Sequence, residues 1–158
     1  MIKFTSFLIL FFGTTFSVFA QSKKDIVRNK IKTQTITSTT GDKTIYENKF
    51  VYDSKGHQIE TTDYTKEGAV KDIHKIKYNS EGDEVEDLQF DANSKLVEKK
   101  ETKYNSLGEK TEEIFYDENN KFTKKNVYLY DGKGLRTEKK TIDASGKITS
   151  IKKYTYTK

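Results

Sequence analysis

Short stretches in which polar residues alternate with hydrophobic or aromatic ones run from residue 43 to residue 156. Each stretch is eight or ten residues long and is followed by a turn-like sequence. In that sequence an aromatic residue (Ile142 in one case) is followed by Asp, Asn or Thr, and a Gly, Asn or Ser stands four residues after it. The leading residues stand at positions 52, 64, 78, 90, 104, 116, 130 and 142, so their spacing alternates between 12 and 14 residues. The chain therefore carries a 26-residue repeat made of two unequal halves.

The turn-like sequences have the chemistry of β-hairpin loops. An Asp or Asn such as Asp53 accepts hydrogen bonds from main-chain N–H groups of a type I turn, and a Gly such as Gly56 adopts the positive φ that ends a short loop. Spacers of eight or ten residues leave no room for helices between the loops, and a first strand is expected within residues 26–38. The pattern predicts an all-β domain, an antiparallel meander of about ten strands built from 26-residue double-hairpin repeats.

If each turn also sets the register of the strands beside it, opposite residues always have the same parity. Even-numbered residues, which include all ten tyrosines, then share one face of the sheet. The odd face gains opposite-charge neighbours such as Asp87–Lys99 and Glu113–Lys125. One margin of the even face is expected to carry the apolar pairs Tyr64–Val70, Phe90–Leu96, Tyr116–Phe122 and Ile142–Ile148, and the other the pairs Tyr52–Gln58, Tyr78–Glu84, Tyr104–Lys110 and Tyr130–Arg136.

A sheet of ten strands either stays open or closes into a barrel. A barrel would enclose the even face, and charged mid-strand residues such as Glu86, Glu98 and Lys100 are costly to bury. We therefore expect an open, curled single-layer sheet, with a closed up-and-down barrel as the alternative. A transmembrane barrel is disfavoured, because neither face offers a continuous apolar band.

The first twenty residues have a different composition. Lys3 is their one charged residue, residues 7–12 are apolar, and Val18-Phe19-Ala20 ends the segment. This pattern is typical of a secretory signal peptide, and the apolar stretch is too short for a membrane anchor. We expect residues 1–20 to be removed, leaving residues 21–158 as a single β-repeat domain in the periplasm or at the surface of a bacterial cell, with no transmembrane span after cleavage.

Composition and motifs give no indication of catalysis. The chain has no cysteine, which excludes disulfides and thiolate chemistry, and no proline, which agrees with long hydrogen-bonded strands. Its two histidines, His57 and His74, fall on opposite faces in the register above, so they are not expected to share a metal or an acid–base site. No serine has a nucleophile motif and no phosphate loop is present. We therefore expect no enzyme activity, no catalytic residue, no metal and no cofactor.

The tyrosine margin is the candidate binding surface. Tyrosine rings beside basic residues stack on sugar rings or bases, and the candidate residues are Tyr52, Tyr78, Tyr104, Tyr130, Lys110 and Arg136. The chain has a formal net charge of +5, but acidic residues alternate with the basic ones, so nucleic acid is not an expected partner. A cell-surface polymer, a glycan or an envelope protein is expected instead.

The recurring Tyr-Asp-x-x-Gly, as in residues 52–56 and 130–134, resembles the YD repeats of RHS-type bacterial surface and secreted proteins. The resemblance spans about residues 38–156 and implies a β-sheet fold and an envelope role. RHS proteins use such repeats as a shell around a toxin domain, and this chain has too few repeats to enclose one. The Gly turns are also similar to MORN-like repeats of bacterial antitoxins, although the Asn-Gly turn of those repeats is absent here.

Together these features predict a secreted, non-enzymatic β-repeat protein that acts as a binding or scaffold module at the cell envelope. The alternative is a small-ligand carrier in a closed β-barrel. An open sheet also exposes two edge strands that invite self-association, which Lys147, Lys152 and Lys153 in or beside the last strand would restrain.

Overall fold

A computed structural model of the chain describes residues 22–157, so the predicted signal peptide lies outside the described residues. A short helix, α1 (Lys23–Arg28), precedes ten strands that form one sheet in chain order. The strands are β1 (Thr33–Thr40), β2 (Lys43–Tyr52), β3 (Gln58–Tyr64), β4 (Val70–Tyr78), β5 (Glu84–Asp91), β6 (Leu96–Tyr104), β7 (Lys110–Asp117), β8 (Phe122–Tyr130), β9 (Arg136–Asp143) and β10 (Ile148–Lys153).

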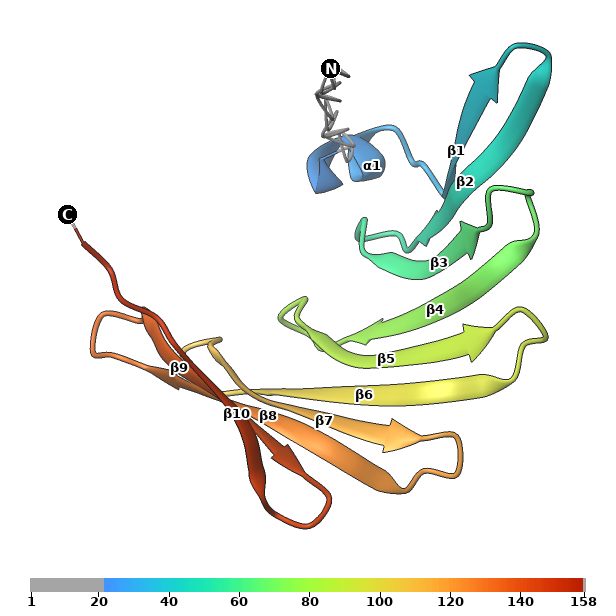
Figure 1. Cartoon of the computed structure of the whole chain (residues 1–158). Helices are drawn as coiled ribbons and strands as arrows, with labels where there is room; N and C mark the ends of the chain where they lie inside the picture. The colour runs from blue at the N-terminus through green and yellow to red at the C-terminus, as the bar shows by residue number, and fades with distance from the viewer. Residues whose placement is uncertain (1–21, 158) are drawn as a thin grey trace, which may run out of the picture.

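The predicted antiparallel meander is confirmed. Every strand pairs antiparallel with its neighbours in sequence, and β1 and β10 form the two edges of a curved, open sheet (Figure 1). The closed barrel is wrong, because β1 and β10 do not pair with each other. No helix among residues 22–157 has the length and apolar character needed to cross a bilayer.

The hairpin loops form as their sequences predict. In the β2–β3 loop the Asp53 carboxylate accepts hydrogen bonds of 2.8 Å from the main-chain N–H groups of Lys55 and His57, and Gly56 has a φ of +76°. Asp or Asn side chains accept the same bonds in later loops, at positions 91, 105, 117, 131 and 143. The repeat in the sequence thus corresponds to a repeat of the same hydrogen bonds within the loops.

The predicted division into even and odd faces is wrong, because the register shifts by one residue next to every loop of the meander from β2 to β10. Tyr52 lies opposite Gln58 as expected, but Val51 then lies opposite Glu60. One extra residue at the start of each following strand is a β-bulge, which strengthens the local twist. Beyond the bulge, residues of opposite parity face each other. Asp87 consequently contacts Lys100 at 3.2 Å instead of Lys99, and Lys125 contacts Glu112 at 3.1 Å instead of Glu113.

The shifted register divides the tyrosines between the two faces, since paired residues share a face and neighbours along a strand alternate. One face, here called the Tyr78 face, carries tyrosines 52, 78, 104, 128 and 130. The other, the Tyr116 face, carries tyrosines 46, 64 and 116 together with Phe90, Phe122 and Ile142. The four expected apolar pairs do form at the margin where they were expected, but on the Tyr116 face, opposite to the face of Tyr78.

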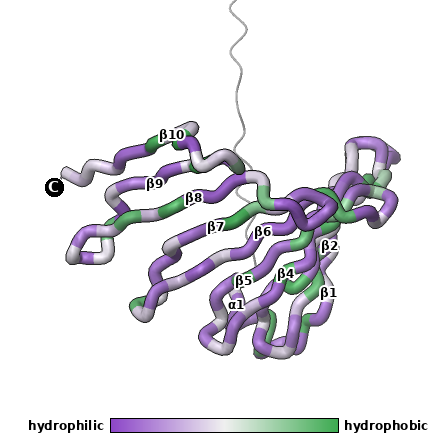
Figure 2. The backbone as a smooth tube through the Cα atoms, turned by 90° about the horizontal axis from the view of Figure 1, so that it is seen from below, coloured by the Kyte–Doolittle hydropathy of each residue, from purple (hydrophilic) through white to green (hydrophobic). Residues whose placement is uncertain are grey.

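The sheet has almost no hydrophobic core. Among the described residues, Ile26 and Tyr128 are the buried hydrophobic side chains. Most residues along the chain are hydrophilic, and short hydrophobic stretches are scattered over several strands (Figure 2). Cross-strand pairs stabilise the layer instead, among them Lys77–Glu86 at 2.7 Å and the edge-on rings of Tyr116 and Phe122.

Helix α1 was not expected. Ser22 caps its N-terminus by accepting a hydrogen bond from the Asp25 N–H, and Asp25 and Arg28 form an ion pair across one turn at 2.6 Å. Ile26, in the middle of the helix, has a fully buried side chain. The first strand therefore begins at Thr33, within the expected range but after the helix.

Candidate functional site

The predicted binding residues lie along one margin of the Tyr78 face. Tyr104 is paired with Lys110 and Tyr130 with Arg136, as the turns predicted. The hydroxyls of these tyrosines, however, are used within the sheet. Tyr78 donates to the carbonyl of Gln58 at 2.9 Å, Tyr104 to that of Glu84 at 3.0 Å, and Tyr130 to that of Lys110 at 2.9 Å.

These bonds form a ladder with the 26-residue period, since the donor tyrosines are 26 residues apart. Each bond joins a tyrosine to the carbonyl of the residue twenty positions before it. Tyr156 continues the ladder with a 2.8 Å bond to the carbonyl of Arg136. Tyr52 belongs to the first repeat and donates to the Gln34 side chain at 2.8 Å instead. Burial raises the pKa of Tyr52, Tyr78 and Tyr104, so all three stay protonated and keep donating. The ring surfaces of these residues are thus what the margin offers a partner.

The two predicted basic residues also have internal contacts. Lys110 forms a 2.8 Å ion pair with Glu113. The Arg136 guanidinium lies 4.5 Å from the ring centre of Tyr128, with the rings of Tyr130 and Tyr154 within 6 Å. The sequence pattern missed Glu113, Tyr128 and Tyr154 as neighbours of these residues, because the bulges that bring them together are not visible in the turn spacing.

Glu113 is the most strongly perturbed carboxylate of this cluster. Burial opposes its ionisation, but hydrogen bonds from Lys110, Tyr128 and Asn126 outweigh burial and lower the pKa of Glu113 to about 2. Burial, and then the hydrogen bond to Glu113, raise the pKa of Tyr128. Each partner therefore stabilises the protonation state in which the other binds it, which is the behaviour of a structural pair.

His57 lines a small cavity near the β2–β3 loop. Its side chain is 7% exposed, its Nδ1 lies 2.9 Å from a carboxylate oxygen of Asp53, and its ring stacks on Tyr78 at 4.5 Å. Its Nε2 has no hydrogen-bond partner among the described residues. The cavity measures about 180 Å³ and is lined by Ser54, Ile59, Ile76 and others. The hydrogen bonds that join the His57 ring and its main-chain N–H to the Asp53 carboxylate lie within the loop, so they hold the ring and the loop in place.

The prediction that the two histidines lie on opposite faces is wrong. His74 is on the Tyr78 face, like the ring on which His57 stacks. Its Nδ1 lies 2.9 Å from Asp87 and its Nε2 3.7 Å from Asp72. Each histidine thus has carboxylate partners of its own, and residues 22–157 contain no group of three or more His, Asp or Glu side chains suited to a metal ion.

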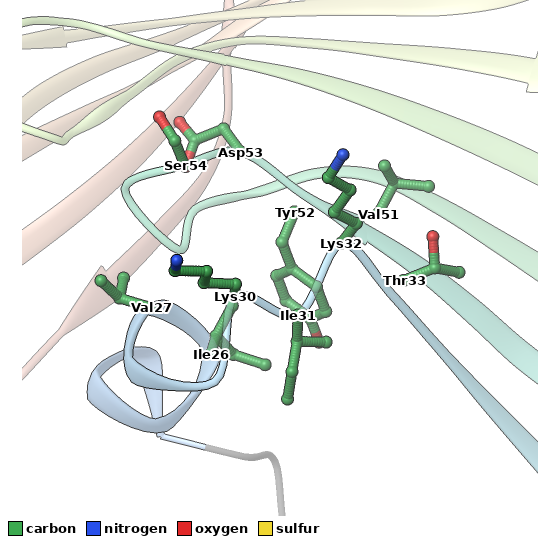
Figure 3. A pocket seen from close by; sticks show the side chains of 10 residues that line it. All are labelled: Ile26, Val27, Lys30, Ile31, Lys32, Thr33, Val51, Tyr52, Asp53 and Ser54. Carbon is green, nitrogen blue, oxygen red and sulfur yellow. The ribbon is translucent and has the colours of Figure 1, made fainter.

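A larger cavity lies between α1 and the end of β2, and it was not predicted because it depends on the helix. Its volume is about 770 Å³, within the ~300–1,000 Å³ range of small-molecule sites. The apolar lining comes from Ile26, Val27, Ile31, Val51 and the Tyr52 ring, and the charged residues beside it are Lys30, Lys32 and Asp53 (Figure 3).

No family model matches the sequence, and no curated protein matches it. Among solved structures the chain is similar to a protein of unknown function from Bacteroides fragilis, with 10% identity, a TM-score of 0.45, and coverage of 80% of this chain and 96% of that chain. It is also similar to a part of TarM, with 18% identity and a TM-score of 0.31, over 79% of this chain but 22% of TarM. At these levels of similarity, the function has to be inferred from the residues of the chain itself.

Proposed function

We propose that the protein is a secreted, non-enzymatic binding or scaffold module of the bacterial cell envelope. The observation that carries this proposal is an open ten-stranded sheet with almost no core, in which most side chains of both faces are half-buried or exposed. Such a sheet offers an extended surface rather than a catalytic cleft. The signal-peptide pattern of residues 1–20 and the resemblance to YD repeats support export to the periplasm or cell surface.

The proposed binding surface is the tyrosine margin of the Tyr78 face. Tyr78, Tyr104 and Tyr130 recur on every second strand, and two strand spacings correspond to about 10 Å. Their hydroxyls are fixed by the ladder, so the rings are held in place before a ligand arrives. A surface that repeats in this way fits a partner that also repeats, and we assign a glycan or another cell-surface polymer as that partner.

The test compares two triple variants at positions 78, 104 and 130 in a pull-down with purified bacterial cell-wall polysaccharide. Tyr→Phe at all three keeps the rings, and retention of the polymer is expected. Tyr→Ser at all three removes the rings, and loss of retention is expected while the β-sheet circular dichroism persists. Tyr64→Ser and Tyr116→Ser on the Tyr116 face are the matched controls, and the polymer should still bind to both. Equal retention by the Ser triple variant would exclude this surface.

A second candidate function is the binding of a small ligand, which the cavity between α1 and β2 favours. Binding of a ligand in this cavity does not require a closed barrel. Apolar walls from Ile26, Val27 and Ile31 fit a hydrocarbon chain, and Lys30 and Lys32 fit an anionic head group. The proposed ligand class is therefore a single-chain amphiphile with a phosphate or carboxylate head.

Dodecyl phosphate and dodecyl maltoside, both below their critical micelle concentrations, distinguish an anionic from a neutral head group. Thermal stabilisation of the protein by dodecyl phosphate alone is expected. Lys30→Glu should weaken the effect, whereas Lys24→Glu, a substitution in α1 but outside the cavity lining, should not. Stabilisation by neither detergent, or equal effects of both Lys variants, would rule this function out.

A further inference from the structure

The two edges of the sheet differ in how they are protected. β1 has the sequence Thr-Gln-Thr-Ile-Thr-Ser-Thr-Thr, with no charge, no proline and a high proportion of β-branched residues. β10 is exposed along its whole length, carries Lys152 and Lys153, and follows Lys147. Lysines on an edge strand are a common protection against pairing with another chain, and β1 lacks them.

The hydrogen-bonding groups on the free side of β1 can be assigned from its pairing with β2. The carbonyl of Lys32 accepts a hydrogen bond from the Tyr52 N–H, which fixes which residues of β1 point their main-chain groups inward. The β1–β2 register shifts between Ile36 and Thr37, but the extra residue of this bulge, Glu47, lies on β2, so β1 itself keeps alternating. Even-numbered residues of β1 therefore bond to β2, and the N–H and C=O groups of Thr35, Thr37 and Thr39 point away from the sheet.

We propose that this free edge pairs with β1 of a second copy of the chain, antiparallel and about a two-fold axis at Thr37. In that register Thr35 lies opposite the partner's Thr39, and all the paired groups are the outward-pointing ones. The same register places Lys32 beside the partner's Asp42, twice by symmetry, and this charge complementarity selects it over registers shifted by two residues. The two sheets then form one continuous sheet whose faces keep their identity across the axis.

The β10 edge does not support the same contact. Two β10 strands in antiparallel pairing bring together the lysines at positions 147, 152 and 153, and like charges directly opposite one another destabilise a sheet. Pairing through β1 therefore ends at a dimer, with the two β10 strands at its outer edges. The proposal is independent of the polymer assigned to the tyrosine margin, since that margin and the β1 edge are separate surfaces. Lys32 also borders the cavity between α1 and β2, so the Thr35 variants test the dimer without touching that cavity.

Sedimentation equilibrium of the purified protein tests the proposal, with matched lysine substitutions on the two edges. The protein itself should be dimeric at micromolar concentration. Thr35→Lys should yield a monomer, whereas Thr149→Lys on β10 should remain a dimer. Thr35→Pro removes an outward donor without removing a β1–β2 hydrogen bond, so it should also yield a monomer while its circular dichroism is unchanged. A monomer at all concentrations, or equal effects of Thr35→Lys and Thr149→Lys, would overturn the proposal.

A charge exchange tests the register. Lys32→Glu and Asp42→Lys should each weaken the dimer roughly tenfold, because each places like charges together at two symmetric contacts. The double variant should restore the affinity. A double variant that dimerises more weakly than both single variants would exclude this register. That result would also show that the loss in Asp42→Lys comes from a disturbed β1–β2 loop and not from repulsion by Lys32.

Discussion

The Tyr104 hydroxyl donates a 3.0 Å hydrogen bond to the main-chain carbonyl of Glu84, at the start of the neighbouring strand β5. The same bond recurs at Tyr78, Tyr130 and Tyr156, always to the carbonyl twenty residues earlier. A layer with almost no core thus has a polar contact that joins adjacent strands once in every repeat. The tyrosines that first suggest a binding surface are therefore also structural residues.

Tyr104→Phe should lower the free energy of unfolding by about 1–2 kcal/mol, because it leaves the Glu84 carbonyl without this donor in a half-buried position. Urea denaturation measures the change. Tyr46→Phe is the matched control, since Tyr46 is 52% exposed and its hydroxyl has no hydrogen bond within residues 22–157, and it should be neutral. Equal stabilities of the two variants would show that the ladder is not stabilising.

The loops and the meander were predictable from sequence because their determinants are local. Asp53 and Gly56 fulfil their roles within five residues of chain, and the 26-residue period repeats those roles. The division into faces was not predictable in the same way. It depends on the bulge that places Val51 opposite Glu60 and not opposite Ile59, and this bulge lies beyond the turn. The cavity was missed for a related reason. It requires a six-residue helix, and so short a helix is stabilised by its contacts with the sheet rather than by its sequence.

Glu113 should make stability depend on pH at the acid end. Its folded pKa of about 2 lies below the ordinary value of 4.5, so its contribution is fully present above pH 4.5 and is lost as the pH falls toward 2. The shift corresponds to roughly 3 kcal/mol. Urea midpoints measured from pH 6 to pH 2 should fall more steeply in the unmodified protein than in Glu113→Gln. Parallel curves would contradict the role assigned to Glu113.

Gly56 and Gly108 provide a matched pair that reports on the docking of α1. Their φ values are +76° and +75°, so Ala costs about 1 kcal/mol of backbone strain at either position. A Cβ at Gly108 meets nothing within 4 Å, whereas one at Gly56 would lie 2.9 Å from Val27 Cγ2 and 3.0 Å from the Lys23 carbonyl oxygen. Gly56→Ala should therefore be the less stable variant, and limited proteolysis should cut it faster near α1. Indistinguishable variants would mean that α1 is not held against this loop.

Ser94 and Asn120 occupy the loop position at which the neighbouring repeats have Gly68 and Gly146. All four residues have positive φ, with +63° at Ser94 and +60° at Asn120. Ser94→Gly removes about 1–2 kcal/mol of strain and adds up to about 1 kcal/mol of chain entropy to the unfolded state, so a net stabilisation of roughly 0.5 kcal/mol is expected. Asn120→Gly should gain less, because Asn tolerates this conformation better.

Ser106→Gly is the control for the Ser94 substitution. Ser106 lies in the β6–β7 loop and is not among the residues with positive φ, so Gly relieves no strain there and only increases the entropy of the unfolded chain. Thermal unfolding should therefore show a higher Tm for Ser94→Gly and a lower Tm for Ser106→Gly. Shifts of the same sign in both variants would show that Ser94 is not strained, and that this loop tolerates a side chain at the position where two of its counterparts have glycine.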